Sequence, residues 1–400
     1  MTELLAPAGS PEKLRWAAAY GADAVYFGMK DFSLRSFAGN FTPEEAEEGL
    51  KLLHSQGKKG YAALNIYPRS FEYGKVLETA GILSEIGVDA FISADPGVIS
   101  LLIKHFPKIE MHVSTQANTV SSQTALFYAG LGASRVNLAR ELSFSEIKRI
   151  AEETKGRIET EVFIHGSVCF SYSGRCAISD YLAGRGANGG KCAQSCRWQY
   201  SLCEEKRPGE YMPVFEDERG LYLFNSRDLA LFRYVPKLID AGVSSLKIEG
   251  RMKNIHYLAS VISLYRRLID GEDIPEEEAS ELISRVPNRR YSEGFMPDGK
   301  TGPDDYSTDM GKYSAGSEFV ACGTASVRNG LREFTAKANI YAGETLEMIT
   351  PDGNRRDIVM PNPIPCGDGA LRETVHSCHT VMLDESYGEY ALLRRVEKNG

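Results

Sequence analysis

Four cysteines on one glycine-rich stretch are the residues of this chain whose spacing most directly implies chemistry. Cys169, Cys176, Cys192 and Cys196 are separated by 6, 15 and 3 residues. Four thiolates on a flexible loop can wrap a tetrahedral zinc ion or a cubane iron–sulfur cluster. Structural zinc usually binds two short C-x2-4-C knuckles, and only the pair Cys192 and Cys196 resembles one. The irregular spacing therefore favours an iron–sulfur cluster, of the 4Fe-4S type.

Two other interpretations of these cysteines stay open. A structural zinc site would use the same four thiolates, and four buried free cysteines would need no metal. Cys203 is the nearest substitute ligand, because five of the eight cysteines lie between residues 169 and 203. The C-x3-C-x2-C pattern of radical enzymes that use S-adenosylmethionine is absent. A disulfide framework is not expected in a cytoplasmic chain of 400 residues.

A second group of polar residues falls where short apolar runs end. Lys247, Glu249 and Arg251 alternate along one run, so the two-residue period of a strand puts them on one face. His165 stands just before the cysteine loop, and an imidazole can move protons near neutral pH. We predict that these four residues are catalytic. Candidates for substrate binding at the ends of other runs are Asn65, Gln116 and Arg140.

Each of these polar residues also has a structural explanation. Lys247, Glu249 and Arg251 could belong to a buried ion-pair network that ties the layers of the fold together. His112 lies deeper in its apolar run, where core packing explains it at least as well as catalysis does. Glu161 lies at the opposite end of its run from His165, so we expect it to be structural.

The elements that must position these residues alternate in a regular order. We predict strands at 4–8, 24–28, 59–66, 90–94, 109–115, 134–139, 158–165 and 245–249. The predicted helices are at 11–20, 44–56, 75–86, 96–105, 120–130, 144–154, 228–241 and 254–270. Eight strands that alternate with eight helices indicate an α/β fold of the (β/α)8 TIM-like barrel class. The rival is an open doubly wound sheet, which usually has a glycine-rich phosphate loop where this chain reads Ala6-Pro7-Ala8-Gly9-Ser10-Pro11.

One connection is much longer than the others. About 60 residues separate the strand at 158–165 from its helix, and loops of that length are usually functional. Loops that follow strands lie on the C-terminal face of a barrel, where active sites are found. We therefore predict a barrel over 1–285 with the iron–sulfur loop at 166–224, a linker over 286–315 and a small antiparallel β-barrel over 316–400.

The overall composition is that of an ordinary globular protein, with 42% hydrophobic and 25% charged residues. Residues 1–10 lack a basic start followed by an apolar core, and no apolar run approaches the roughly 18 residues of a membrane span. We therefore expect a cytoplasmic protein. A net charge of −8 argues against a generally basic nucleic-acid binder, although a local basic groove is compatible with it.

The stretch around the first two cysteines resembles the signature of a known family, the collagenase-like peptidases of unknown catalytic type. It reads EVFIHGSVCFSYSGRCAIS at 161–179. The residues that match the signature are Glu161, Phe163, Gly166, Ser167, Cys169, Gly174, Cys176 and Ser179. Further stretches similar to the family are GADAVYFG at 21–28, HVSTQAN at 112–118 and SLKIEGRMK at 245–253. The resemblance spans the whole region of the predicted barrel.

The resemblance implies a hydroxylase more than a peptidase. No H-E-x-x-H or G-x-S-x-G motif is present, whereas better understood relatives are oxygen-independent hydroxylases with iron–sulfur clusters. One branch hydroxylates the wobble uridine of tRNA with prephenate as hydroxyl donor, and the length and β segment of this chain resemble that branch most. Prephenate carries two carboxylates, which Arg140, Arg227 and Arg251 are suited to bind.

Three alternatives to a tRNA hydroxylase remain. The first is a peptidase that acts on unfolded or collagen-like chains. The second is a hydroxylase that acts on 23S ribosomal RNA or on a ubiquinone precursor, as other branches of the family do. The third is a non-catalytic RNA-binding scaffold held together by zinc. Residues 316–400 carry 12 acidic and 9 basic side chains, so any contact with RNA must be local.

Overall fold

The computed structural model describes residues 2–30, 40–168, 227–298 and 316–395, together with isolated residues and short strands between 179 and 222. Eight parallel strands form a closed sheet, because the last of them pairs with both the first and the seventh. These strands are β1 (Glu3–Pro7), β2 (Ala24–Phe27), β3 (Lys59–Ala63), β4 (Ala90–Ser93), β5 (Glu110–Val113), β6 (Arg135–Asn137), β7 (Glu159–Ser167) and β13 (Ser245–Ile248). The predicted TIM-like barrel is therefore confirmed.

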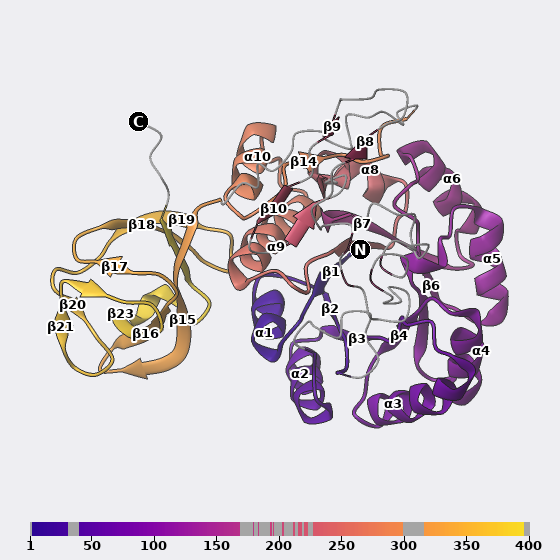
Figure 1. Cartoon of the computed structure of the whole chain (residues 1–400), viewed down its shortest axis with the longest axis horizontal. Helices are drawn as coiled ribbons and strands as arrows, with labels where there is room; N and C mark the ends of the chain where they lie inside the picture. Colours follow the sequence, from indigo (N-terminus) through magenta and orange to yellow (C-terminus); the bar gives the residue numbers. More distant parts are fainter. Residues whose placement is uncertain are drawn as a thin grey trace. The chain divides into compact units, whose positions relative to one another are not determined.

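Helices alternate with the strands, and Figure 1 shows α2 to α6 arranged outside the barrel strands. The helices within the described residues are α1 (Pro11–Ala19), α2 (Pro43–Ser55), α3 (Tyr73–Glu85), α4 (Pro96–His105), α5 (Ser122–Leu131), α6 (Phe144–Thr154), α8 (Val235–Asp240), α9 (Ile255–Ile269) and α10 (Glu276–Ser284). Thr42 and Ser143 both form capping boxes, which satisfy the free N–H groups at the starts of α2 and α6. Gly132 ends α5 with φ 107°, a left-handed conformation that favours glycine.

The prediction of a helix over 228–241 is wrong in its first part. Asp228–Ala230 forms strand β12, which runs antiparallel to the end of β7 and parallel to β14 (Tyr291–Ser292). A short 3-10 turn, η5 (Phe232–Tyr234), follows before α8 begins. Pro236 suits the first turn of that helix, because its nitrogen has no proton to leave unpaired there. The long insertion therefore leaves and re-enters the fold at the C-terminal end of β7.

The described part of the insertion contains four short strands. They are β8 (Leu202–Cys203), β9 (Tyr211–Met212), β10 (Phe215–Asp217) and β11 (Gly220–Tyr222). They pair antiparallel as β8 with β9 and β10 with β11, so the described part of the insertion contains two small ribbons.

The chain divides into two compact units, and the second combines residues 254–288 with residues 314–400. Its described strands are β15 (Glu318–Arg328), β16 (Leu331–Ala336), β17 (Ile340–Tyr341), β18 (Thr345–Ile349), β19 (Arg355–Val359), β20 (Ile364–Pro365), β21 (Leu371–Arg372), β22 (Thr374–Val375), β23 (Thr380–Asp384) and β24 (Leu392–Arg395). Six of them form one sheet in the order β19-β18-β24-β15-β16-β23, and its pairings are antiparallel. The predicted antiparallel character of this region is confirmed.

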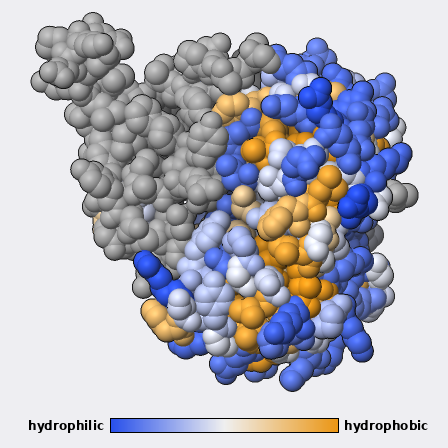
Figure 2. Space-filling model, turned by 90° about the vertical axis from the view of Figure 1, so that its right-hand side faces the viewer, coloured by the Kyte–Doolittle hydropathy of each residue, from blue (hydrophilic) through white to orange (hydrophobic). Residues whose placement is uncertain are grey.

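One outer side of the barrel unit carries apolar surface among hydrophilic residues (Figure 2). Helix α5 lies on that side, and its Phe127 and Leu131 are both exposed. Among the residues that the structure describes, no helix is both long enough and apolar enough to cross a membrane.

Candidate functional site

Most of the predicted site residues that the structure describes lie at the C-terminal ends of the barrel strands, whereas Lys247 lies within β13. Each of these ends contributes to the mouth of a barrel, where active sites are built. Within the described residues the mouth includes Asn65 after β3, Gln116 after β5, Arg140 after β6, His165 in β7, Arg227 before β12, Glu249 and Arg251 after β13. The fold thus brings together residues that are widely separated in the sequence.

The turn after β5 is fixed from two sides. It contains the 3-10 helix η2 (Thr115–Ala117), and Tyr67 donates a hydrogen bond of 2.8 Å to the carbonyl of Gln116. On the other side, the Thr115 hydroxyl donates to the carbonyl of Leu138 over 3.1 Å, and the N–H of Ala139 donates to the carbonyl of Thr119 over 3.0 Å. The ends of β3, β5 and β6 are thereby joined into one rim.

Several side chains at this rim contain buried polar atoms that have no hydrogen-bond partner among the described residues. These atoms are Asn65 Oδ1, Gln116 Oε1, Asn118 Oδ1, Arg140 Nε and Arg227 Nε. Buried polar atoms are nearly always paired, so a group of unpaired ones needs an explanation. The four residues predicted to bind substrate are all in this group. Asn118 was missed as a site residue, although its position in the HVSTQAN stretch was a usable signal.

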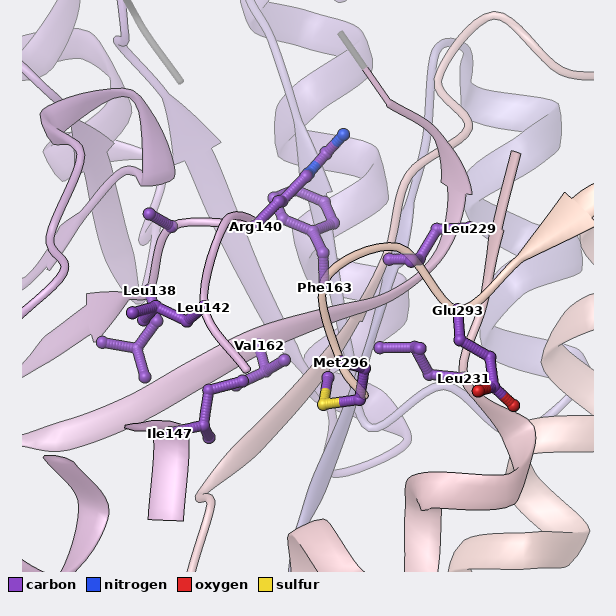
Figure 3. A pocket seen from close by; sticks show the side chains of 11 residues that line it. Leu138, Arg140, Leu142, Ile147, Val162, Phe163, Leu229, Leu231, Glu293 and Met296 are labelled. Carbon is purple, nitrogen blue, oxygen red and sulfur yellow. The ribbon is translucent and has the colours of Figure 1, made fainter. Parts of the chain in front are cut away.

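Arg140 has the best defined surroundings of the two arginines in this group. Its Nη1 donates a hydrogen bond of 2.7 Å to the carbonyl of Ser167, and its guanidinium lies 3.9 Å from the centre of the Phe163 ring. Figure 3 shows the guanidinium directed away from the apolar hollow formed by Leu138, Leu142, Val162 and other side chains. Stacking on Phe163 therefore holds the cation in place. Its Nε has no acceptor among the described residues, so it can donate a hydrogen bond to a ligand.

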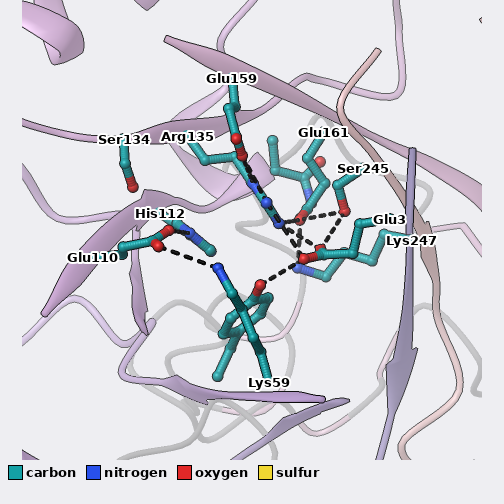
Figure 4. Close-up of polar contacts among 12 residues, drawn as sticks. Glu3, Lys59, Glu110, His112, Ser134, Arg135, Glu159, Glu161, Ser245 and Lys247 are labelled. Carbon is teal, nitrogen blue, oxygen red and sulfur yellow. Dashed lines mark hydrogen bonds and ion pairs between the residues drawn. The ribbon is translucent and has the colours of Figure 1, made fainter. Parts of the chain in front are cut away.

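Lys247, a predicted catalytic residue, lies in a charged network inside the barrel (Figure 4). Its Nζ donates a hydrogen bond of 2.7 Å to Glu161 Oε1, and both side chains are buried. Arg135 links Glu161 to Glu3 and Glu159, with shortest N–O distances of 3.4, 2.6 and 2.6 Å respectively. Burial alone would raise the pKa of Glu161, but Lys247 and Arg135 lower it to about 2. Glu161 is therefore a carboxylate at neutral pH.

Glu249 and Arg251 follow Lys247 in the sequence, and their side chains have different surroundings from that of Lys247. Strand β13 ends at Ile248, and its pairing with β7 shifts register there. Glu249 accepts a hydrogen bond of 3.2 Å from Tyr26, whose ring belongs to the inner apolar cluster of the barrel. Arg251 is buried in the turn that follows, and its carbonyl accepts a hydrogen bond from Lys13. The side-chain alternation of a β-strand therefore ends before Arg251, so it does not predict in which direction the Arg251 side chain points.

His165 is buried beside β12 and lies 5.1 Å from the ring of Tyr291, measured between ring centres. Burial lowers the pKa of His165 to about 3, and the nearby Asp228 only partly opposes this shift. The imidazole is therefore neutral near pH 7. In that state it can donate one hydrogen bond and accept one, and its low pKa makes it a weak base.

The four cysteines predicted as metal ligands, Cys169, Cys176, Cys192 and Cys196, lie outside the described residues. In the described part of the chain, no group of three His, Cys, Asp or Glu residues is arranged to hold a metal ion. Two described residues of the same segment are in contact, since the N–H of Ala193 donates a hydrogen bond of 2.9 Å to the buried hydroxyl of Ser179.

These features define a class of protein. It is a TIM-like barrel whose mouth carries amide and guanidinium groups and whose cysteine-bearing insertion follows β7. The sequence model of peptidase family U32 matches residues 9–304. The chain belongs to that family, as its signature predicted. A solved structure of a U32 peptidase aligns with 62% of this chain at 16% identity, with a TM-score of 0.41.

The names of curated relatives refer to two kinds of activity, the hydroxylation of RNA and proteolysis. The tRNA hydroxylation protein P of Escherichia coli is 36% identical over 397 residues, which cover 88% of this chain and 87% of that protein. The 23S rRNA 5-hydroxycytidine synthase of Escherichia coli is 35% identical over 319 residues, which cover 79% of this chain and 46% of that protein. An uncharacterized protease of Methanocaldococcus jannaschii is 40% identical over 304 residues, which cover 74% of this chain and 73% of that protein.

Proposed function

We propose that this protein is an enzyme that hydroxylates RNA, with tRNA as its substrate. Relatives named as tRNA hydroxylation proteins match 88% of the chain, and a relative named as an rRNA hydroxycytidine synthase matches 79% of it. We infer further that the modified base is the wobble uridine and that the reaction needs no molecular oxygen. The enzyme then works in the cytoplasm, where its substrate is found.

The observation that carries this proposal is the set of unpaired polar atoms at the barrel mouth. Asn65, Gln116, Arg140 and Arg227 each have one buried polar atom without a partner in the described chain. A buried polar atom without a partner costs about 1–3 kcal/mol, so the mouth gains free energy when a polar ligand pairs with these atoms. A substrate with both hydrogen-bonding and anionic groups fits that requirement.

Prephenate is the proposed hydroxyl donor, and its two carboxylates need cations. Arg140 and Arg227 offer guanidinium groups at the mouth, and Arg251 follows the neighbouring strand β13. Guanidinium groups bind carboxylates through two parallel hydrogen bonds, which orients the acid as well as holding it. His165, which is neutral near pH 7, can orient a substrate through a hydrogen bond, and Glu249 can do the same.

An iron–sulfur cluster is the proposed cofactor, with Cys169, Cys176, Cys192 and Cys196 as its ligands. The cluster would supply or relay electrons at the mouth, or stabilise the insertion. The hydrogen bond between Ala193 and Ser179 supports this proposal, because it joins the sequence after Cys176 to the sequence between Cys192 and Cys196.

Mass spectrometry of tRNA nucleosides tests the proposed function. A strain that lacks the gene should lose hydroxylated wobble uridine, and a plasmid copy of the wild-type gene should restore it. Purified protein with iron, prephenate and unmodified tRNA should form the same nucleoside without oxygen. If the deletion strain keeps a normal level of the hydroxylated nucleoside, tRNA hydroxylation is not the function of this protein.

A further inference from the structure

Three side-chain amides lie on two turns of the barrel mouth, which the hydrogen bond from Tyr67 to the Gln116 carbonyl joins. Asn65 follows β3, whereas Gln116 and Asn118 both lie in the turn after β5. The side-chain oxygen of each is buried, and none has a hydrogen-bond partner among the described residues. We call these three residues the amide group. The hydrogen bonds within the turn use backbone atoms and the hydroxyls of Ser114 and Thr115, and they leave the three amide oxygens unpaired in the described chain.

The backbone that carries the amide group is rigidly supported. Tyr67, two residues after Asn65, donates its hydrogen bond to the carbonyl of Gln116. Thr119, one residue after Asn118, forms a backbone bridge with Leu138. Asn118 itself adopts φ 53°, a left-handed conformation that asparagine tolerates better than most residues. The amides are therefore positioned before any ligand arrives, which lowers the entropy cost of binding.

Amides recognise a particular kind of ligand. A carboxamide presents an acceptor oxygen and a donor N–H side by side, and its complement is a group with a donor and an acceptor at the same spacing. A carboxylate is a poor partner for buried amide oxygens because it has only acceptors. The anionic substrate is therefore better placed at Arg140, whose neighbour Ala139 bonds to the carbonyl of Thr119.

We propose that the amide group binds the Watson–Crick edge of the uracil base that is to be hydroxylated. This inference rests on the proposed function, because that function supplies an RNA uridine as the substrate. The uracil edge has one N–H donor at N3 between two carbonyl acceptors, so N3–H can donate to one amide oxygen while the carbonyls accept from side-chain N–H groups of the other amides. Enzymes that modify a base usually take it out of the stack and read this edge with hydrogen bonds. The mouth then has an amide part for the base beside a guanidinium part for the acid.

Binding of two synthetic anticodon stem-loops tests the proposal. One carries uridine at the wobble position, and the other carries 3-methyluridine, in which a methyl group replaces the N3 proton. Fluorescence anisotropy of the purified holoprotein should show roughly tenfold weaker binding of the methylated loop, as expected for loss of one base-edge contact. Prephenate is left out of this measurement, so that only the RNA subsite is assayed.

Variants of the amide group complete the test. Gln116→Met keeps the length of the side chain without its hydrogen bonds, and Asn118→Gly suits the left-handed backbone but removes the amide. The variant that has lost the acceptor of the N3 proton should bind the two loops within about threefold of each other, because the discriminating contact is gone. Gln123→Glu is the matched control, because Gln123 is exposed on α5 and its replacement adds a charge without touching the mouth. This control should discriminate as the wild type does.

Three results would overturn the proposal. Equal binding of both loops by the wild-type protein would show that the uracil edge is not read. Undiminished discrimination by both folded variants, Gln116→Met and Asn118→Gly, would assign the reading to other residues. A variant that raises the KM for prephenate but leaves loop binding unchanged would assign the amides to the acid. If the wild-type protein bound neither loop, the proposed function itself would fail, and the amide proposal with it.

Discussion

The ammonium group of Lys247 lies 2.7 Å from the carboxylate of Glu161, and both side chains are buried inside the barrel. The rings of Tyr26 and Phe163 lie 4.6 and 5.4 Å from the same ammonium group. Lys247 therefore has a carboxylate partner and two aromatic neighbours of its own. We propose that it stabilises the interior of the barrel below the mouth, where Tyr26 also donates a hydrogen bond to Glu249.

The first prediction concerns the stability of this buried pair. Lys247→Met or Glu161→Gln should each lower the free energy of unfolding by roughly 3–5 kcal/mol, because removal of one partner leaves the other charge buried and uncompensated. Urea denaturation followed by circular dichroism measures the change. Lys51→Met is the control, since the exposed pair of Lys51 and Glu47 should contribute no more than about 1 kcal/mol. A loss of less than about 1 kcal/mol in both buried variants would contradict a supporting role.

The same pair predicts a dependence of stability on pH. The pKa of Glu161 is about 2 in the folded protein, below the value of about 4.3 expected in the unfolded chain. A depressed pKa contributes stability that is present above the unfolded value and is lost as the pH falls through the folded value. Wild-type protein should therefore lose more stability between pH 5 and pH 2 than Glu161→Gln does. Denaturation curves of the two proteins at several pH values check this, and parallel losses would contradict it.

The third prediction concerns the guanidinium groups. Arg140→Lys and Arg251→Lys keep a positive charge but lose the two-pronged geometry, so each should reduce turnover or prephenate affinity at least about tenfold. Steady-state kinetics and melting temperatures on the same samples separate binding from folding. Arg149→Lys, at an exposed position of α6, should change neither quantity. Normal wobble-uridine hydroxylation in cells that carry only Arg140→Lys or only Arg251→Lys would refute the carboxylate role of that arginine.

A further prediction concerns the cysteines. Single replacement of Cys169, Cys176, Cys192 or Cys196 by serine should abolish iron binding and the broad absorption band near roughly 400 nm that a cubane cluster gives. Serine at Cys378, which is exposed, or at Cys322 and Cys366, which are buried in the second unit, should leave the iron content unchanged. Iron analysis of anaerobically purified proteins decides the matter. Full iron occupancy in Cys192→Ser would point to Cys203 as the fourth ligand instead.

The last prediction concerns the peptidase label of the family. The sequence contains neither the zinc-peptidase nor the nucleophile-elbow motif, so purified holoprotein should not cleave gelatin or casein. A zymogram and a soluble assay with labelled casein measure this. Cleavage that follows the protein through several columns and disappears in a point variant would show that the peptidase alternative is right.

The sequence alone determined the barrel and the rim of the mouth. Alternation of short apolar runs with amphipathic segments is a local property of the chain, and it located all eight barrel strands. Polar residues at the ends of those runs identified Asn65, Gln116 and Arg140 because parallel strands bring their ends to one face. The same local reasoning failed at Asp228, where pairing with Ser167 on β7 makes a strand of what was expected to be a helix.

Only the tertiary structure decided which rim and interior residues face one another. A two-residue period states that Lys247 and Glu249 share a face, but it does not state that Lys247 meets Glu161 while Glu249 meets Tyr26. Those partners depend on how the strands are staggered around the closed barrel, which no single strand encodes. The unpaired amide of Asn118 is likewise a result of packing, since burial depends on the neighbours that closure brings around it.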